Sequence, residues 1–232
     1  MKQLAKVFGT LLANRQSVYR RFARTYDMVY FGTIGAQDEE HRMVRGVTVS
    51  TRHVDNHYCV GTIHGYDVVL LERIDTLKEP GATRPESYRW IILQIDLHAA
   101  QSLPHTFIDG RHHDTIFYKH IFMKFSQLVK VEPRFLSLSD AAFDDHFTAF
   151  TSVSNTPILA QLLTQELTAT LGAHFAHLDF EWEEDRLLVY CNGKTPTTVL
   201  LEHMLRAGLW LARELDQRAR TTLAHQHTAD AA

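Results

Sequence analysis

The spacing of apolar residues changes near residue 26, and this change restricts the fold more than any other feature of the sequence. Before it, apolar residues recur every three or four positions, as on one face of a helix; they are Leu4, Val7, Phe8, Leu11, Val18 and Phe22. After it, segments rich in Val, Ile and Tyr follow a period of two, which is typical of strands. The chain therefore predicts a helix followed by an antiparallel meander.

The strand-like segments are separated by turn residues. We expect strands at 26–34, 45–51, 57–65, 66–74, 88–97 and 105–109, with a Pro/Gly loop at 75–87. A shorter strand is expected at 134–139, and residues 143–153 predict either another short strand or a strand with a loop. Residues 178–193 predict a hairpin that turns at Glu184 and Asp185.

Three further helices are predicted by their boundary residues. Asp114 suits the cap of a helix at 114–131, although residues 116–125 would also suit a strand. Pro157 and Gly172 suit the start and the exit of a helix at 156–172. Thr195 suits the cap of a long helix from Pro196 to about residue 220. The fold class is therefore α+β, a mainly antiparallel sheet with N-terminal, central and C-terminal helices packed on it. We expect a basic amphipathic helix at 1–25, a single α+β domain at 26–222 and a disordered tail at 223–232.

The composition narrows the function. The formal net charge of −3 argues against a nucleic-acid partner, which favours basic chains. Cys59 and Cys191 lie far apart, without metal-binding spacing, and are expected to be small buried residues. The sequence has no run of 18 apolar residues and no signal-peptide core, so we expect a cytoplasmic or membrane-peripheral protein.

The predicted N-terminal helix combines an apolar face with a basic one. On a helical projection Lys2, Lys6, Arg20, Arg21 and Arg24 lie opposite the apolar residues, whereas Arg15 does not. This layout is typical of a helix that lies on an anionic membrane surface. The alternatives are an acidic protein partner and a helix docked on its own domain. Deleting residues 1–24 leaves the domain folded in the first two cases and unfolds it in the last.

The segment Pro104–His120 contains four of the 15 histidines of the chain, together with Asp109 and Asp114. Three ligands that converge on an open position make a catalytic zinc site. Asp109, His113 and His120 converge only if the loop between them folds back, because residues seven apart on a helix are separated by about 10 Å. We therefore expect His112 and His113 to lie in an exposed turn, where their joint replacement by Ala changes the melting temperature little.

Other motifs carry less information. Residues 192–195 resemble the end of a phosphate-binding loop but lack its first glycine. The sequence contains no GxSxG, HExxH or GxGxxG motif, so we predict no catalytic residue, no metal ligand and no cofactor.

Several segments in order resemble an uncharacterised bacterial domain family of unknown function. They include GYDVVLL, ESYRWIILQIDL, LPHTFID, FDDHFTAF, PILAQLLTQEL and FEWEEDRLLVY, within residues 60–215. The resemblance implies an α+β fold and brings no functional residues. Members often carry membrane-spanning helices before the domain, where this chain has its basic helix.

These features favour a non-enzymatic module that binds an unknown protein partner or an anionic membrane surface through Lys2, Lys6, Arg20, Arg21 and Arg24. The alternative function is a metal-assisted hydrolase built on the histidine-rich segment from Asp109 to His120. The sequence gives no indication of oligomeric state.

Overall fold

A computed structural model describes the backbone of residues 2–34, 44, 46–48, 53–77, 85–99, 103–111, 113–136 and 140–229, and the side chains of these residues except 2–13, 134 and 221–229. Its elements in chain order are α1 Lys2–Thr25, β1 Val29–Ile34, β2 His53–Ile63, β3 Tyr66–Leu77, β4 Glu86–Asp96, β5 Leu103–Asp109, α2 Thr115–Lys124, β6 Val129–Lys130, η1 Pro133–Phe135, α3 Ala141–His146, β7 Thr148–Thr151, η2 Val153–Asn155, α4 Thr156–Leu162, α5 Gln165–His174, β8 Asp179–Glu184, β9 Arg186–Asn192 and α6 Thr198–Ala229.

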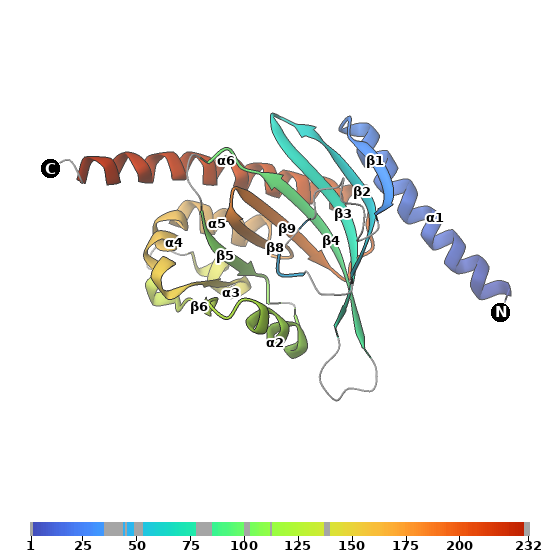
Figure 1. Cartoon of the computed structure of the whole chain (residues 1–232), viewed down its shortest axis with the longest axis horizontal. Coiled ribbons are helices and arrows are strands. Elements are labelled where there is room, and N and C mark those ends of the chain that lie inside the picture. The colour runs from blue at the N-terminus through green and yellow to red at the C-terminus, as the bar shows by residue number, and fades with distance from the viewer. Residues whose placement is uncertain are drawn as a thin grey trace. The chain divides into compact units, whose positions relative to one another are not determined.

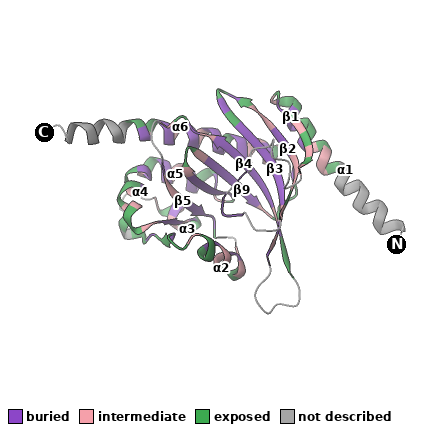
Figure 2. Ribbon diagram, in the orientation of Figure 1, coloured by how far each residue is buried: buried purple, intermediate pink, exposed green. Residues whose placement is uncertain are grey.

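The predicted α+β class is confirmed. The described strands form a nine-stranded antiparallel sheet in the order β1-β2-β3-β4-β9-β8-β5-β7-β6, with N-terminal, central and long C-terminal helices packed on it (Figure 1). Figure 2 shows that the central strands are largely buried, as expected for a sheet covered by helices. Among the described residues, none of the helices has the length and apolar character that crossing a membrane requires.

The chain forms two compact units, and each of them is discontinuous in sequence. Unit 1 comprises residues 1–94 and 190–206, and unit 2 comprises residues 95–189 and 207–232. Strands β4 and β9 and helix α6 therefore each begin in one unit and end in the other.

Unit 1 is built on a long hairpin. Strands β2 and β3 pair from His53↔Asp75 to Ile63↔Tyr66, and the chain turns at His64 and Gly65, both of which have positive φ. Helix α1 contacts β1 and β2. Tyr19, Phe22 and Ala23 of this helix are only 0, 0 and 2% exposed, so this half of α1 belongs to the core of the unit.

Unit 2 brings together strands that are far apart in sequence. Strand β5 pairs with β7 through Phe107↔Phe150 and with β8 through Ile108↔Phe180. On the helical layer, α3 and α5 pack closely at Gly172, where an added Cβ would lie 2.6 Å from the backbone nitrogen of Phe143. Gly172 therefore serves this contact within α5, and the predicted helix exit at Gly172 is wrong because α5 continues to His174.

Several other predicted boundaries differ from the structure because of local hydrogen bonds. The helix predicted at 156–172 is two helices, since Thr164 is extended and its hydroxyl caps α5 by accepting from Leu167 N–H. The first part of the strand predicted at 143–153 is helix α3, capped by Asp140. The long helix is capped by Thr197 and not by Thr195, because the Thr197 hydroxyl accepts from Leu200 N–H.

Three remaining differences concern the extent of elements. Helix α2 ends at Lys124, before the predicted end at residue 131. Residues 134 and 135 of the strand predicted at 134–139 belong to the 3-10 turn Pro133–Phe135. In the segment predicted as a strand at 45–51, the described residues Gly46–Thr48 form a bend that is buried near Arg73. Helix α6 extends to Ala229, beyond its predicted end near residue 220; residues 230–232 lie outside the described residues.

Candidate functional site

The basic residues of α1 that the structure describes lie on its exposed side. Arg20, Arg21 and Arg24 are exposed, whereas Tyr19 and Phe22 between them are fully buried. The guanidinium of Arg20 lies 5.2 Å from the ring centroid of Tyr30 on β1, within the range of a cation–π contact. We call Arg20, Arg21 and Arg24 the arginine surface. The side chains of Lys2 and Lys6 lie outside the described residues.

Arg15, the exception in the helical projection, attaches α1 to the sheet. Its Nη1 lies 3.0 and 2.9 Å from the two carboxylate oxygens of Glu72 on β3. Arg89 of β4 forms a second ion pair with Glu72, and the Tyr19 hydroxyl donates to the same carboxylate. Glu72 is 1% exposed. The docked-helix alternative is therefore the one that the structure favours for residues 14–25.

Near this ion cluster, an imidazole stacks against α1. The ring of His57 lies 4.8 Å from that of Tyr19, and its Nδ1 is 2.9 Å from the Tyr30 hydroxyl. Burial lowers the pKa of His57, which favours the neutral ring. Burial and the Glu72 carboxylate raise the pKa of Tyr19. This contact between α1 and the sheet is thus mediated by uncharged rings beside a charged pair.

In unit 2, the histidine-rich segment folds back on itself. Asp109 ends β5, and Arg111, with a φ of 57°, turns the chain away from the strand. The guanidinium of Arg111 donates to the carbonyl of Phe147 at 2.5 Å and to the Thr148 hydroxyl at 2.9 Å. Asp114 then caps α2 by accepting from Phe117 N–H at 2.9 Å, as predicted. These contacts hold the loop so that His113 points back at the sheet.

The loop brings His113 between two carboxylates. His113 Nε2 lies 3.0 Å from Asp179 Oδ2 and 3.5 Å from Asp109 Oδ1. The carboxylates are neighbours because β5 and β8 are antiparallel, with Ile108 opposite Phe180. The three side chains are between 1 and 3% exposed. We call Asp109, His113 and Asp179 the Asp–His cluster.

The expectation that His113 lies in an exposed turn is therefore wrong. The contacts of Arg111 with Phe147 and Thr148, which hold the loop so that the His113 side chain reaches the sheet, join residues far apart in sequence and do not follow from periodicity. His112 lies outside the described residues. Of the histidine-rich segment, Asp109 and His113 come together with Asp179, whereas half-buried His120 is not part of this group of donors.

Burial and charge act in opposite directions on these groups. Burial raises the pKa of Asp109, and the nearby Asp179 carboxylate adds to the effect. Burial alone would lower the pKa of His113, but its hydrogen bond to Asp179 and the two carboxylate charges outweigh burial and raise it. The Asp–His cluster therefore favours a positive charge between its carboxylates.

A second buried histidine of unit 2 pairs with β8. His105 Nε2 lies 2.7 Å from Glu181 Oε1, and Nδ1 lies 3.8 Å from Glu183 Oε1. Burial disfavours the charged imidazole, yet the Glu181 hydrogen bond and the two carboxylate charges raise the pKa of His105 above 6.5, with Lys124 opposing them.

This raised pKa predicts a pH-dependent stability. A base whose pKa is higher in the folded state stabilises that state below the unfolded-state pKa, and the effect is lost as pH rises through the folded-state pKa. We expect His105→Gln to lower the melting temperature more at about pH 5.5 than at about pH 8. The control His174→Gln, at an exposed position, should show the same small difference at both values. A His105→Gln effect that grows with pH would contradict this assignment.

Sequence reasoning missed the acidic partners of these sites. Glu72, Asp179 and Glu181 are 1 to 2% exposed. Glu72 lies in a mainly apolar strand, whereas in β8 the acidic residues alternate with Phe180 and Trp182. A carboxylate at a buried position of a predicted strand would have indicated these sites, because a buried charge requires a partner. The identity of the partner depends on pairings between distant segments.

Comparisons with known proteins add a fold likeness. No family model and no curated protein matches the chain. A crystal structure of the mycobacterial trehalose monomycolate transport factor A, TtfA, is similar in fold, with a TM-score of 0.58 and 10% sequence identity. The match covers 89% of this chain and 94% of TtfA. At this identity the likeness establishes a shared α+β fold.

Proposed function

We propose that this protein is a non-enzymatic, transport-associated module that docks on an anionic membrane surface through the arginine surface. The observation that carries the proposal is the division of α1, with Tyr19 and Phe22 in the core and Arg20, Arg21 and Arg24 exposed. The fold likeness to a transport factor supports the transport association. From the resemblance within residues 60–215, we also propose that the chain belongs to the uncharacterised bacterial domain family.

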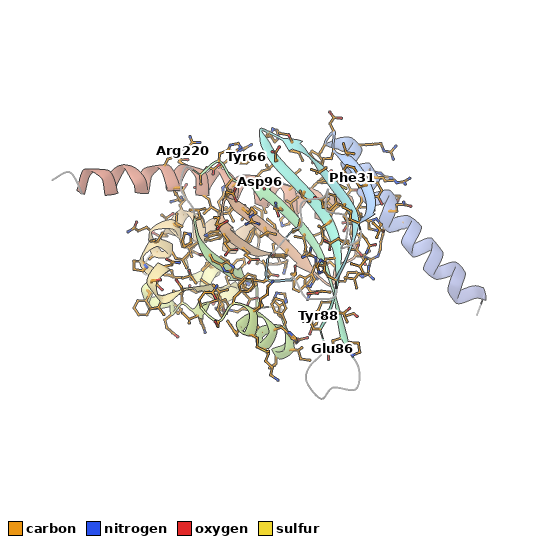
Figure 3. All side chains as sticks on the ribbon, in the orientation of Figure 1. Phe31, Tyr66, Glu86, Tyr88, Asp96 and Arg220 are labelled. Carbon is orange, nitrogen blue, oxygen red and sulfur yellow. The ribbon has the colours of Figure 1, made fainter. Side chains whose placement is uncertain are left out.

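The packing of α1 determines how such docking works. Because Tyr19 and Phe22 are buried in unit 1, they are unavailable for insertion between lipids. Attraction then rests on charge, at about 1 kcal/mol for each basic side chain near an anionic membrane. On the following strand, Val29 and Phe31 are 57 and 47% exposed. Figure 3 labels Phe31 on the edge strand β1, where its ring lies 6.3 Å from that of Tyr58. Because side chains alternate along a strand, Val29 and Phe31 face away from Tyr30 and Arg20 and add nothing to the arginine surface.

Replacement of the three arginines of the arginine surface with Gln should weaken binding to anionic vesicles by about 100-fold, since three contributions of about 1 kcal/mol are lost. A matched control carries Arg206→Gln, Arg213→Gln and Arg220→Gln, which remove three charges from exposed positions of α6. This control should retain most of the binding. Vesicle sedimentation at low and physiological salt measures both variants, and salt should weaken binding of the unaltered chain.

Two results would contradict the membrane proposal. Equal losses in both triple variants would mean that net charge, and not the arginine surface, governs binding. Binding to an acidic protein without any binding to anionic vesicles would assign the arginine surface to a protein partner.

The Asp–His cluster bears on the alternative function, a metal-assisted hydrolase. Two carboxylates and an imidazole are a suitable donor set for a divalent metal. A catalytic metal also needs a position that substrate reaches, whereas these side chains are at most 3% exposed. Their burial favours a structural role for the cluster over hydrolysis.

A further inference from the structure

We propose that Asp109, His113 and Asp179 bind one divalent transition-metal ion, with zinc as the best fit, and that this ion fastens the start of α2 to strands β5 and β8. The inference concerns unit 2 and is independent of the proposed membrane docking. It differs from the hydrolase alternative because it assigns the ion a structural role.

The donor atoms have the spacing that a metal requires. His113 Nε2 is 3.0 Å from Asp179 Oδ2 and 3.5 Å from Asp109 Oδ1, and one donor atom from each residue lies within 4.8 Å of the other two. Donors about 2.1 Å from a tetrahedral zinc ion are about 3.4 Å apart. Small movements of the side chains therefore suffice for an ion to replace the proton between them.

Each carboxylate is oriented by a second donor. The backbone N–H of Gly110 donates to Asp179 Oδ1 at 2.8 Å, and the Tyr118 hydroxyl donates to Asp109 Oδ2 at 2.6 Å. These bonds engage the outer oxygen of each carboxylate and direct the other oxygen at His113. Metal sites commonly fix their ligands by such outer hydrogen bonds.

An independent observation points to a ligand. Asp109 is 1% exposed, yet its Oδ1 accepts no hydrogen bond, although its other oxygen does. A buried carboxylate oxygen that accepts no close hydrogen bond is costly. This atom faces His113 at 3.5 Å, where a metal ion would satisfy it.

The charge of the site also favours a divalent ion. Two carboxylates, a neutral imidazole and a divalent cation together carry no net charge, as suits a buried site. The imidazole donor favours zinc or cobalt over magnesium or calcium, which prefer oxygen ligands. Three protein donors leave one tetrahedral position for a small ligand such as water, and the burial of the donors keeps a substrate from reaching it.

Titration of the metal-free full-length protein with Co²⁺ tests the site, because bound Co²⁺ reports its ligands in its visible absorption. We expect saturation at one equivalent, loss of the signal in His113→Gln and Asp179→Asn, and competition by Zn²⁺. The matched control is His105→Gln, which also removes a buried histidine paired with carboxylates in unit 2 and should bind Co²⁺ normally. Tyr118→Phe removes only the outer hydrogen bond and should weaken affinity by about 10- to 100-fold.

The unaltered protein provides a second measurement if the ligand variants fail to fold. The ring of Phe117 lies 4.1 Å from that of His113, and the ring of Tyr118 lies 6.3 Å away. Paramagnetic Co²⁺ should perturb the NMR signals of these two rings before those of His105, which is four residues from Asp109 along a strand, or about 13 Å. Absence of a one-to-one complex, or perturbation that spares Phe117 and Tyr118, would overturn the proposal.

Discussion

Deletion of Met1 to Arg24 is expected to unfold unit 1. The deletion removes Tyr19 and Phe22, both 0% exposed, and the Arg15 partner of buried Glu72. Truncation of one buried aromatic side chain costs about 3–5 kcal/mol, and most domains are stable by only about 5–15 kcal/mol in total. Loss of both aromatic side chains and of the ion pair therefore removes most or all of the free energy of unfolding of such a domain. Circular dichroism and a thermal melt of the truncated chain measure the effect.

A pair of neighbouring substitutions separates packing from charge. Phe22→Ala should lower the free energy of unfolding by about 3–5 kcal/mol, whereas Arg21→Ala, at an exposed position, should change it by less than about 0.5 kcal/mol. A truncated chain that retains a cooperative melt would show that α1 is a dispensable appendage. Of the alternatives predicted from the sequence, deletion would then favour the surface-binding helix.

Replacement of His113 with Ala should destabilise the protein by about 3–5 kcal/mol, because it leaves two buried carboxylates side by side without a cation. For a chain of 232 residues, this loss lowers the melting temperature by roughly 6–20 °C. The measurement is a thermal melt with a chelator present, so that it reports the protein without metal.

The control for this substitution is His174→Ala, since His174 is exposed in the same unit. Its effect should stay within about 0.5 kcal/mol. A similarly small change for His113→Ala would contradict the buried position and support the exposed turn expected from the sequence. It would also mean that the buried carboxylates find protons or other donors without the imidazole.

Periodicity predicted the parts of the fold that depend on neighbours in sequence. Helix α1, the cap at Asp114 and the hairpin turn between β8 and β9 depend on residues within one or two turns of each other, and all three are confirmed. Local pattern also identified Cys59 and Cys191 as buried residues.

The same reasoning failed where a single side chain accepts a backbone hydrogen bond and so sets where a helix begins. Thr164 and Asp140 each cap a short helix in a segment whose apolar spacing suits a longer helix or a strand. The sites were hidden for another reason. Arg15 meets Glu72 across 57 positions, and His113 meets Asp179 across 66. Their contacts depend on helix packing and on sheet register between distant segments, which no local window contains.

The discontinuity of the two units has a consequence for biosynthesis. Unit 1 needs residues 190–206 in addition to residues 1–94. The sheet of this unit therefore remains incomplete until a partner strand is synthesised near the end of translation. Contacts of such high sequence separation slow folding and prolong the exposure of unpaired strands. We therefore expect nascent chains stalled before residue 190 to hold β1–β4 in a form that requires chaperones, and native protease resistance of this unit to arise only after residue 206 has emerged.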